Sequence, residues 1–157
     1  MDLSIKLGSY KLNIRATGVI IHNNKILLHK NRNEDYYALL GGRVAIGENS
    51  EETIKREVME ELGKKVEVLD YIATIENFFE IKGLKYHEIM FVHRIEFVDK
   101  EDKLIEHTLK NIEGEDNIQY EWIDLNEFDE HVILPKDIKE VLKKGIYPVH
   151  LINNDIS

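Results

Sequence analysis

Three glutamates, Glu57, Glu60 and Glu61, crowd the last turns of a helix that the sequence predicts from Ser50 to Leu62. Their spacings place like charges on one helix face, and carboxylates lie unfavourably at the negative, C-terminal end of the helix dipole. Each effect costs from a few tenths of a kcal/mol to about 1 kcal/mol. We therefore expect a positive group to lie among these side chains.

The ends of this helix are marked by local signals. Asn49 is a suitable N-cap with Glu52 three residues later, which is a variant of the capping box, and Gly63 suits the position after the last turn. The apolar stripe recurs every four residues, at Ile54, Val58 and Leu62. At about 100° per residue, the glutamates occupy the adjacent arc at the edge of the buried face. A partly desolvated ion site fits this position.

The rest of the chain predicts strands and one further helix. Two apolar runs, 15–21 and 26–29, flank Asn23-Asn24 and predict a hairpin, and Lys30 to Asp35 reads as a polar loop. Long strands are expected over 66–75 and 86–97, with Phe78-Phe79 and Lys82-Gly83 between them. The remaining expectations are an acidic loop over 99–117, a last strand over 118–123, and a helix over 135–144 with Pro135 early and Gly145 after its end. This order predicts a mixed α/β sandwich.

Composition narrows the class of protein. A length of 157 residues fits one domain, and 43% hydrophobic with 32% charged residues is typical of a soluble globular protein. No apolar run approaches the roughly 20 residues that span a bilayer, and the first residues resemble no signal peptide, so we expect a cytoplasmic protein without a membrane partner. The absence of cysteine excludes disulfides, thiolate metal sites and cysteine nucleophiles. The net charge of −9 argues against binding of long nucleic acid, although metal ions can bridge an acidic protein to a small anion.

A longer pattern surrounds the glutamates. It has the spacing Gly-x5-Glu-x7-Arg-Glu-x-x-Glu-Glu-x-Gly, filled by Gly42, Glu48, Arg56, Glu57, Glu60, Glu61 and Gly63. This stretch resembles the signature box of the Nudix hydrolases of the MutT-like type. Lys64 and Leu40 depart from the family pattern, but both lie at its margins. The resemblance implies an α/β/α sandwich with a mixed β-sheet, formed by residues 1–157 as a single domain.

The resemblance also implies roles for the matching residues. Glu57 and Glu61 would be the principal ligands of Mg²⁺ or Mn²⁺, Glu60 would bind a further ion or orient the attacking water, and the carbonyl of Gly41 would complete the metal site. Glu48 and Arg56 would form an ion pair that holds the preceding loop against the helix. Hard oxygen ligands are what these cations prefer, independently of the family. The implied reaction is attack of water on one phosphorus of a nucleoside diphosphate linked to another group.

Further candidates lie outside the box. The general base is either a box glutamate or a later one, and Glu113, Glu115 and Glu88 are the later candidates. Arg43, Arg32 and Lys30 could contact phosphate. Trp122 and the pair Phe78-Phe79 could stack on a base. For each group there is a plainer interpretation, namely solvated carboxylates, surface cations and core aromatics.

The substrate stays open between several small nucleotides. The proline that commonly follows the box in the ADP-ribose branch is absent, since the prolines here are Pro135 and Pro148. Tyr71 and Tyr86 match the tyrosine of the dinucleoside polyphosphate branch poorly, and the Ser-Gln-Pro-Trp stretch of the NADH branch is missing. A nucleoside triphosphate or nucleotide sugar is therefore the least committed choice, with ADP-ribose as an alternative.

Two other classes share this type of domain. An isopentenyl diphosphate isomerase would rely on a cysteine, which this chain lacks. A non-catalytic nucleotide-binding sensor is the stronger rival, yet such modules tend to lose box glutamates and all of them are present here. Family habit alone suggests a homodimer.

Overall fold

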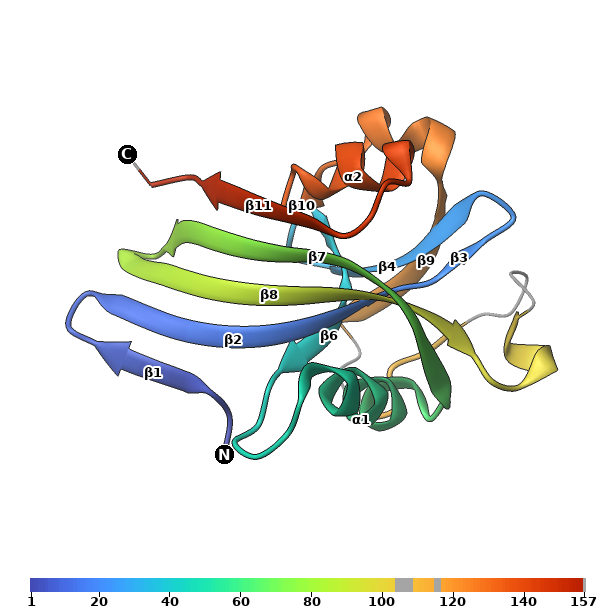
Figure 1. Ribbon diagram of the computed structural model, residues 1–157, viewed down its shortest axis with the longest axis horizontal. Helices are drawn as coiled ribbons and strands as arrows, with labels where there is room; N and C mark the ends of the chain where they lie inside the picture. Colours follow the sequence, from blue (N-terminus) through green and yellow to red (C-terminus); the bar gives the residue numbers. More distant parts are fainter. Residues whose placement is uncertain (104–108, 115–116, 157) are drawn as a thin grey trace.

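The computed structural model describes residues 1–103, 109–114 and 117–156 (Figure 1). Its elements are, in chain order, β1 (Ser4–Leu7), β2 (Tyr10–Val19), β3 (Ile21–His22), β4 (Lys25–Asn31), β5 (Tyr37–Ala38), β6 (Leu40–Arg43), α1 (Ser50–Leu62), β7 (Val66–Ile81), β8 (Leu84–Phe97), the 3₁₀ helix η1 (Lys100–Lys103), β9 (Ile118–Asp124), the 3₁₀ helix η2 (Leu125–Glu130), β10 (Ile133–Leu134), α2 (Ile138–Lys144) and β11 (Val149–Asn154). The predicted bounds of the central helix, Ser50 to Leu62, are confirmed.

The strands form two sheets. The larger, six-stranded sheet has the order β1-β2-β8-β7-β11, and β6 pairs with β2 beside this path. It is mixed, because β2 runs parallel to β8 and β7 runs parallel to β11, whereas β7 and β8 are antiparallel. The smaller, five-stranded sheet has the order β10-β5-β4-β3, with β9 paired to β4. The expected mixed α/β fold with a mixed sheet is confirmed, and the second sheet adds to it.

The predicted hairpin exists, but its first half was assigned wrongly. Ile21 pairs with Ile26 across a turn in which Asn23 and Asn24 both have positive φ, 50° and 61°. Asparagine tolerates this left-handed backbone, which suits a two-residue hairpin turn. However, the run 15–21 does not form one strand, because β2 ends at Val19 in the larger sheet and β3 belongs to the smaller one. The predicted polar loop also begins later than Lys30, since β4 continues to Asn31.

The two long strands extend further than the sequence indicated. β7 runs from Val66 to Ile81, so Phe78 and Phe79 lie within the strand and not between two strands. Lys82 and Gly83 alone form the turn, with φ of 51° and 81°. The aromatic residues continue the ladder because each has a cross-strand partner, His87 for Phe78 and Tyr86 for Phe79.

The C-terminal part differs most from expectation. The last helix begins at Ile138 and not at Pro135, which directly follows β10. It ends as expected at Gly145, whose φ of 65° is left-handed. The strand over 118–123 is confirmed as β9, whereas β1, β11 and η1 were not predicted. In the remainder of the predicted loop, residues 109–114 are described and lie outside helices and strands.

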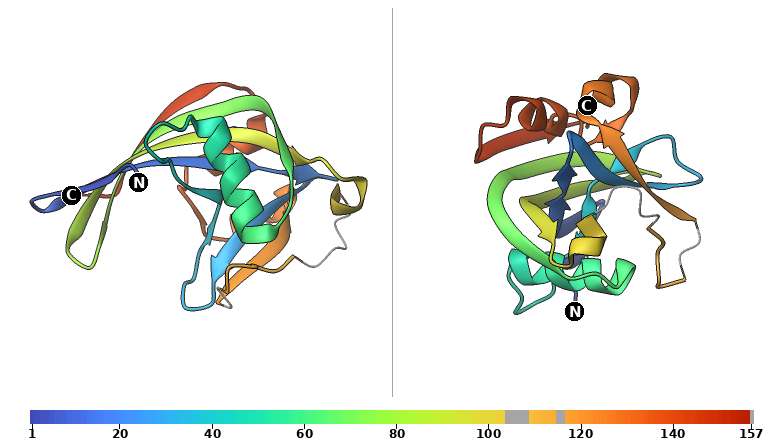
Figure 2. Two further views of the ribbon diagram at one scale, coloured as in Figure 1. Left: turned by 90° about the horizontal axis from the view of Figure 1, so that it is seen from below. Right: turned by 90° about the vertical axis from the view of Figure 1, so that its right-hand side faces the viewer.

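Helices cover both faces of the larger sheet (Figure 2). α1 packs through Ile54, Val58 and Leu62 into one buried cluster, and α2 packs into another cluster on the opposite face. Gly18 on β2 permits the close approach of α1, because a Cβ there would lie 2.4 Å from Ile95 Cδ1 and 2.9 Å from Ile54 Cγ1. Within the described ranges, no helix is long and apolar enough to cross a membrane.

Candidate active site

Helix α1 is fixed at both ends by its own sequence. The Asn49 side chain accepts a hydrogen bond from the backbone N–H of Glu52 at 2.9 Å, and the Glu52 carboxylate accepts one from the backbone N–H of Asn49 at 2.9 Å. Gly63 ends the helix in the left-handed conformation and donates to the carbonyl of Met59. Its last turn contains no basic residue. The glutamates therefore lie at a negative helix end that no basic residue of the last turn compensates.

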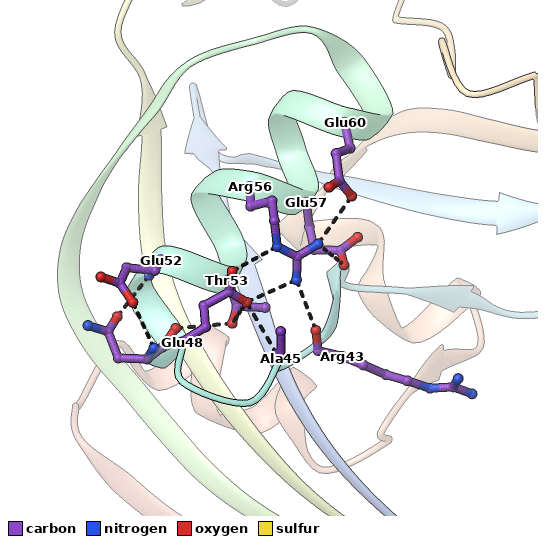
Figure 3. Close-up of polar contacts among 9 residues, drawn as sticks. Arg43, Ala45, Glu48, Glu52, Thr53, Arg56, Glu57 and Glu60 are labelled. Atoms are coloured by element: carbon purple, nitrogen blue, oxygen red, sulfur yellow. Dashed lines mark hydrogen bonds and ion pairs between the residues drawn. The ribbon is translucent and has the colours of Figure 1, made fainter. Parts of the chain in front are cut away.

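Arg56 is the centre of a network that binds the preceding loop to α1 (Figure 3). Its guanidinium donates to both oxygens of Glu48, at 2.8 and 2.9 Å, and to the carbonyl of Arg43 at 3.2 Å. It also donates to Glu57 at 3.0 Å and to Glu60 at 3.1 Å. Thr53 donates to Glu48 as well, at 2.6 Å. Arg56 is thus part of the positive charge that the sequence led us to expect among the glutamates, and the predicted ion pair with Glu48 is present.

This network makes the stability of the protein depend on pH. Hydrogen bonds from Arg56 lower the pKa of Glu48 from 4.5 to about 2, against the opposing effect of burial. A depressed carboxyl pKa contributes stability above the unfolded-state value and loses it as the pH falls through the folded-state value. We expect Glu48→Gln to be destabilising near neutral pH, and its difference from wild type to shrink between pH of about 4.5 and about 2. Urea unfolding of both proteins near neutral and near acid pH measures this, and an equal difference at both would contradict it.

The glycine pair on β6 leaves room for the carboxylate of Glu57. A Cβ on Gly42 would lie 2.2 Å from Glu57 Cδ and 2.4 to 2.5 Å from its oxygens. A Cβ on Gly41, whose φ is 150°, would lie 2.1 Å from the carbonyl oxygen of Ala16 on the paired strand β2. Both positions therefore require glycine, although for different reasons. Gly42 allows Glu57 to approach the strand, and Gly41 allows β6 to pair with β2.

We expect Gly42→Ala to displace the Glu57 carboxylate and to lower both turnover and stability. Accommodation of one methyl group in a tightly packed site costs about 1 to 3 kcal/mol. Combining it with Glu57→Asp removes one methylene from the opposing side chain, so the double variant should regain stability but not activity. Thermal unfolding and turnover of the three variants measure this. If Gly42→Ala is as stable and active as wild type, the contact does not constrain the site.

Glu57 and Glu61 are held in an environment that disfavours their charge. Burial is the main cause that raises the pKa of both, and it raises that of Glu61 to about 8. The charges of Glu57 and Glu113 raise the pKa of Glu61 further, whereas Arg15 lowers it. Among the described residues, the Glu61 carboxylate has no hydrogen bond or ion pair. This largely buried carboxyl group has no direct partner in the described part of the chain, so a cation bound beside it would favour its charged form.

The acidic segment after the sheet reaches this helix end. The backbone N–H of Ile112 donates to the carbonyl of Glu61 at 2.8 Å. This contact brings Glu113 close enough for its charge to raise the pKa of both Glu57 and Glu61. The other candidate in this segment, Glu115, lies outside the described residues. The structure therefore places Glu113 near the box glutamates.

The carboxylate oxygens of the box glutamates do not lie close together. In the described part of the chain, the group of ligand atoms that lie within 4.8 Å of one another is Glu127, Glu130 and His131, at η2. Exposed acidic groups of this kind are common without an ion. The box carboxylates are more widely spread, and hydrogen bonds from Arg56 hold Glu57 and Glu60.

A pocket of about 600 Å³ is lined by Leu39 and Arg43, which lie on either side of the glycine pair in the sequence. Arg15 and Arg43 both line it and are register partners on β2 and β6, so two cations lie side by side on its wall. Figure 3 shows the Arg43 side chain extending away from the Arg56 network. Glu88 also lines the pocket; burial is the main cause that raises its pKa, and Arg15 lowers it. The box glutamates are not among the lining residues, but Arg15 lies close enough to Glu61 for its charge to lower the pKa of that carboxyl, so an anionic substrate on this wall would lie near the box.

The other sequence candidates differ in whether they line this pocket. Phe79 lines it, whereas Phe78, Trp122, Arg32 and Lys30 are not among its lining residues. Trp122 packs against the core below α1, so the plainer interpretation holds for it. Lys30 lies over the ring of Tyr37 at 5.4 Å, and the backbone of Arg32 donates to Asn117. Of the two arginines predicted to contact phosphate, Arg43 lines this pocket and Arg32 does not.

Sequence reasoning missed Arg15. The signal existed, because Asn13, Arg15 and Thr17 alternate with Ile14 and Ala16, and a period of two predicts a strand with one polar face. All three polar residues line the pocket. By contrast, Asn153 also lines it but comes from β11, and nothing local to its sequence indicates pairing with β7.

Comparison with known proteins assigns the chain to a family. Its fold is shared with solved structures named as a UDP-X diphosphatase and as a Nudix-family hydrolase from Clostridium perfringens. The family model described as NUDIX domain matches residues 12–145, and the chain belongs to the Nudix family.

Solved structures share this architecture. The E. coli ORF135 protein is 25% identical with a TM-score of 0.59, and the match covers 88% of this chain and 94% of that one. A MutT protein from Methanosarcina mazei Go1 is 22% identical with a TM-score of 0.60, covering 88% and 95%. A UDP-X diphosphatase is 20% identical with a TM-score of 0.61, covering 88% of this chain and 66% of that one. The MutT protein and the UDP-X diphosphatase, at 22% and 20% identity, show a shared fold only.

Proposed function

We propose that this protein is a divalent metal-dependent pyrophosphohydrolase for a small nucleotide, such as a nucleoside triphosphate or a nucleotide sugar. The observation that carries the proposal is the position of Glu61, a largely buried carboxylate that lies beside Glu57 and close enough to Arg15 for the arginine's charge to lower its pKa. Arg15 in turn lines the pocket together with Arg43. Family membership supports the reaction class, and the UDP-X diphosphatase among the structural neighbours supports a nucleotide substrate.

The residues present fit a bound Mg²⁺ or Mn²⁺. Glu57, Glu61 and the carbonyl of Gly41 would hold it, and Glu60 would hold a further ion or orient water. These are hard oxygen donors, which both cations prefer. Burial and neighbouring like charges raise the pKa of both carboxyl groups, so a nearby cation would favour their ionised forms. When bound, such an ion supplies the charge that polarises the phosphoryl group and activates water.

The chain's own residues would bind the substrate and handle the proton. Arg15 and Arg43 would bind the diphosphate oxygens from the pocket wall, because their side chains line it from adjacent strands. Glu113 or Glu60 would accept the proton of the attacking water. Glu113 comes from a separate segment anchored at the end of α1, and Glu60 is about half exposed beside Arg56. Glu48 and Arg56 would fix the loop before α1 and make no contact with substrate.

The test is turnover on a panel of substrates with and without EDTA. The panel contains nucleoside triphosphates, nucleotide sugars, ADP-ribose and dinucleoside polyphosphates, each with Mg²⁺ or Mn²⁺, and chromatography identifies the products. Release of a nucleoside monophosphate that EDTA abolishes would establish the reaction and its substrate. Nucleotide binding without any turnover would instead favour the sensor. The cytoplasmic location and the homodimer stay predictions.

A further inference from the structure

Four polar side chains form one row across the larger sheet. Asn13 on β2 is the register partner of Glu88 on β8, Glu88 is the partner of Asn77 on β7, and Asn77 is the partner of Asn153 on β11. All four are buried, with 3% to 7% of their surface exposed, and all line the pocket. We call this set the polar row. Such residues are unusual in a sheet interior unless they bind each other or a ligand.

Hydrogen bonds link the members of the polar row. The Asn153 amide donates to Asn77 at 2.8 Å and to Asp155 at 3.0 Å. The Asn77 amide donates to Glu88 at 3.5 Å, and Asn13 hydrogen-bonds the same carboxylate. These contacts use both N–H groups of Asn153 and one each of Asn77 and Asn13, so oxygen acceptors outnumber N–H donors in the capacity that remains.

One of these acceptors has no partner. Asn153 Oδ1 is buried and, among the described residues, accepts no hydrogen bond. Leaving such an atom unpaired costs about 1 to 3 kcal/mol. Because Asn153 lines the pocket, a ligand that brings an N–H or O–H group to this atom would remove that cost.

The polar row lies where the base of a nucleotide would lie if its phosphates met Arg15. On β2, Thr17 pairs with Gly41, and Arg15 and then Asn13 follow on the same face. At about 3.3 Å per residue, Asn13 lies roughly 13 Å along the strand from the level of the glycine pair. Arg15 lies midway. A nucleotide whose phosphates meet Arg15 would therefore direct its base, and not its phosphates, towards the row.

An aromatic pair lies next to the row on the same face. Phe79 and Tyr86 are register partners one alternation beyond Asn77 and Glu88, and their rings stack at 4.7 Å with an angle of 5°. Both line the pocket. Planar aromatic surface beside hydrogen-bond acceptors suits a nucleobase better than a sugar, because a base offers a flat face together with N–H groups at its edge.

We propose that the polar row is the specificity-determining site of this enzyme and that it binds the N–H donors at the edge of the substrate's nucleobase, with Asn153 and Glu88 as the principal acceptors. The inference rests on the proposed function in that the substrate is a nucleotide. It assigns Glu88 to recognition of the base and not to activation of water, since its place in the row is distant from Glu57 and Glu61.

Binding of nucleoside monophosphates tests this without turnover, because they contain no anhydride bond. The probes for isothermal titration are the four common ribonucleoside monophosphates and ribose 5-phosphate, which lacks a base. At least one monophosphate should bind at least tenfold more tightly than ribose 5-phosphate does. Leucine has a shape similar to asparagine but offers no acceptor. Asn153→Leu should therefore lower the affinity for that monophosphate about tenfold and leave the affinity for ribose 5-phosphate unchanged. The matched control is Asn154→Leu, because Asn154 is the exposed neighbour on the same strand. It should bind as wild type does.

Equal binding of all monophosphates and ribose 5-phosphate, or unchanged binding by Asn153→Leu, would overturn the proposal. If Asn153→Leu fails to fold, Glu88→Gln keeps the side-chain shape while replacing an acceptor oxygen with a donor, and retained affinity in that variant overturns it equally. Failure of the proposed function looks different. In that case the monophosphates would still bind through the row, but no substrate of the panel would be cleaved.

Discussion

Replacing Glu61 with glutamine should lower turnover by roughly a hundredfold to ten-thousandfold while the fold stays intact. The amide keeps the shape of the side chain but cannot supply the charge that the proposed metal site needs. Since Glu61 is a largely buried carboxylate among like charges, its replacement should not lower the stability of the metal-free protein. Glu57→Gln should reduce turnover to a similar extent.

The measurement combines turnover with thermal unfolding in EDTA and in excess Mg²⁺. Wild type should unfold at a higher temperature with Mg²⁺, because a ligand that binds only the folded state stabilises it, and Glu61→Gln should lose this increase. Glu51→Gln is the matched control, since Glu51 is an exposed carboxylate in the first turn of the same helix. Wild-type turnover in Glu61→Gln would remove this residue from the site.

Arg56→Ala should damage stability and activity together. The change leaves the carboxylates of Glu48 and Glu57 without their main hydrogen-bond donor, and their side chains are only 17% and 16% exposed. Breaking a buried pair costs more than breaking an exposed one, and for this partly exposed arginine we expect a loss of about 2 to 3 kcal/mol. Turnover should fall because the loop before α1 and the Glu57 carboxylate both lose their anchor.

A double-mutant cycle separates the ion pair from the rest of the network. Urea unfolding of Arg56→Ala, Glu48→Gln and the double variant gives the coupling energy between the two residues. We expect the double variant to be less destabilised than the sum of the single ones, because the second change removes the unpaired carboxylate. Strict additivity would show that the two side chains do not stabilise each other. Arg56→Lys should be intermediate, since lysine keeps the charge but not the bidentate geometry.

Local signals explain what the sequence could predict. Asn49, Glu52 and Gly63 specify the ends of α1 within the helix itself, so its bounds were predicted without error. The ion pair of Glu48 with Arg56 followed from the family pattern and is present. The start of the last helix was predicted wrongly because Pro135 suits a first helical turn, yet here it directly follows β10 and lines the pocket.

Long-range pairing explains what the sequence could not predict. The polar row depends on four strands from distant parts of the chain, and Asn153 joins it only because β11 pairs in parallel with β7. No periodicity near Asn153 contains that information. Likewise, the break between β2 and β3 follows from packing of two sheets and not from residue type, since the run 15–21 reads as one apolar strand.

The one-residue link between β2 and β3 limits how far the two sheets can separate at the pocket. β2 ends at Val19 and β3 begins at Ile21, so the larger sheet, which carries Arg15 and Arg43, is joined through a single residue to the smaller sheet, which carries His29 on the same pocket. That residue, Ile20, is buried in the cluster beneath α1, and its carbonyl accepts a hydrogen bond from Leu27. The two sheets therefore cannot separate at the pocket without opening close-packed core. Substrates should be selected by fit to a preorganised space, with little entropy lost to closure on binding.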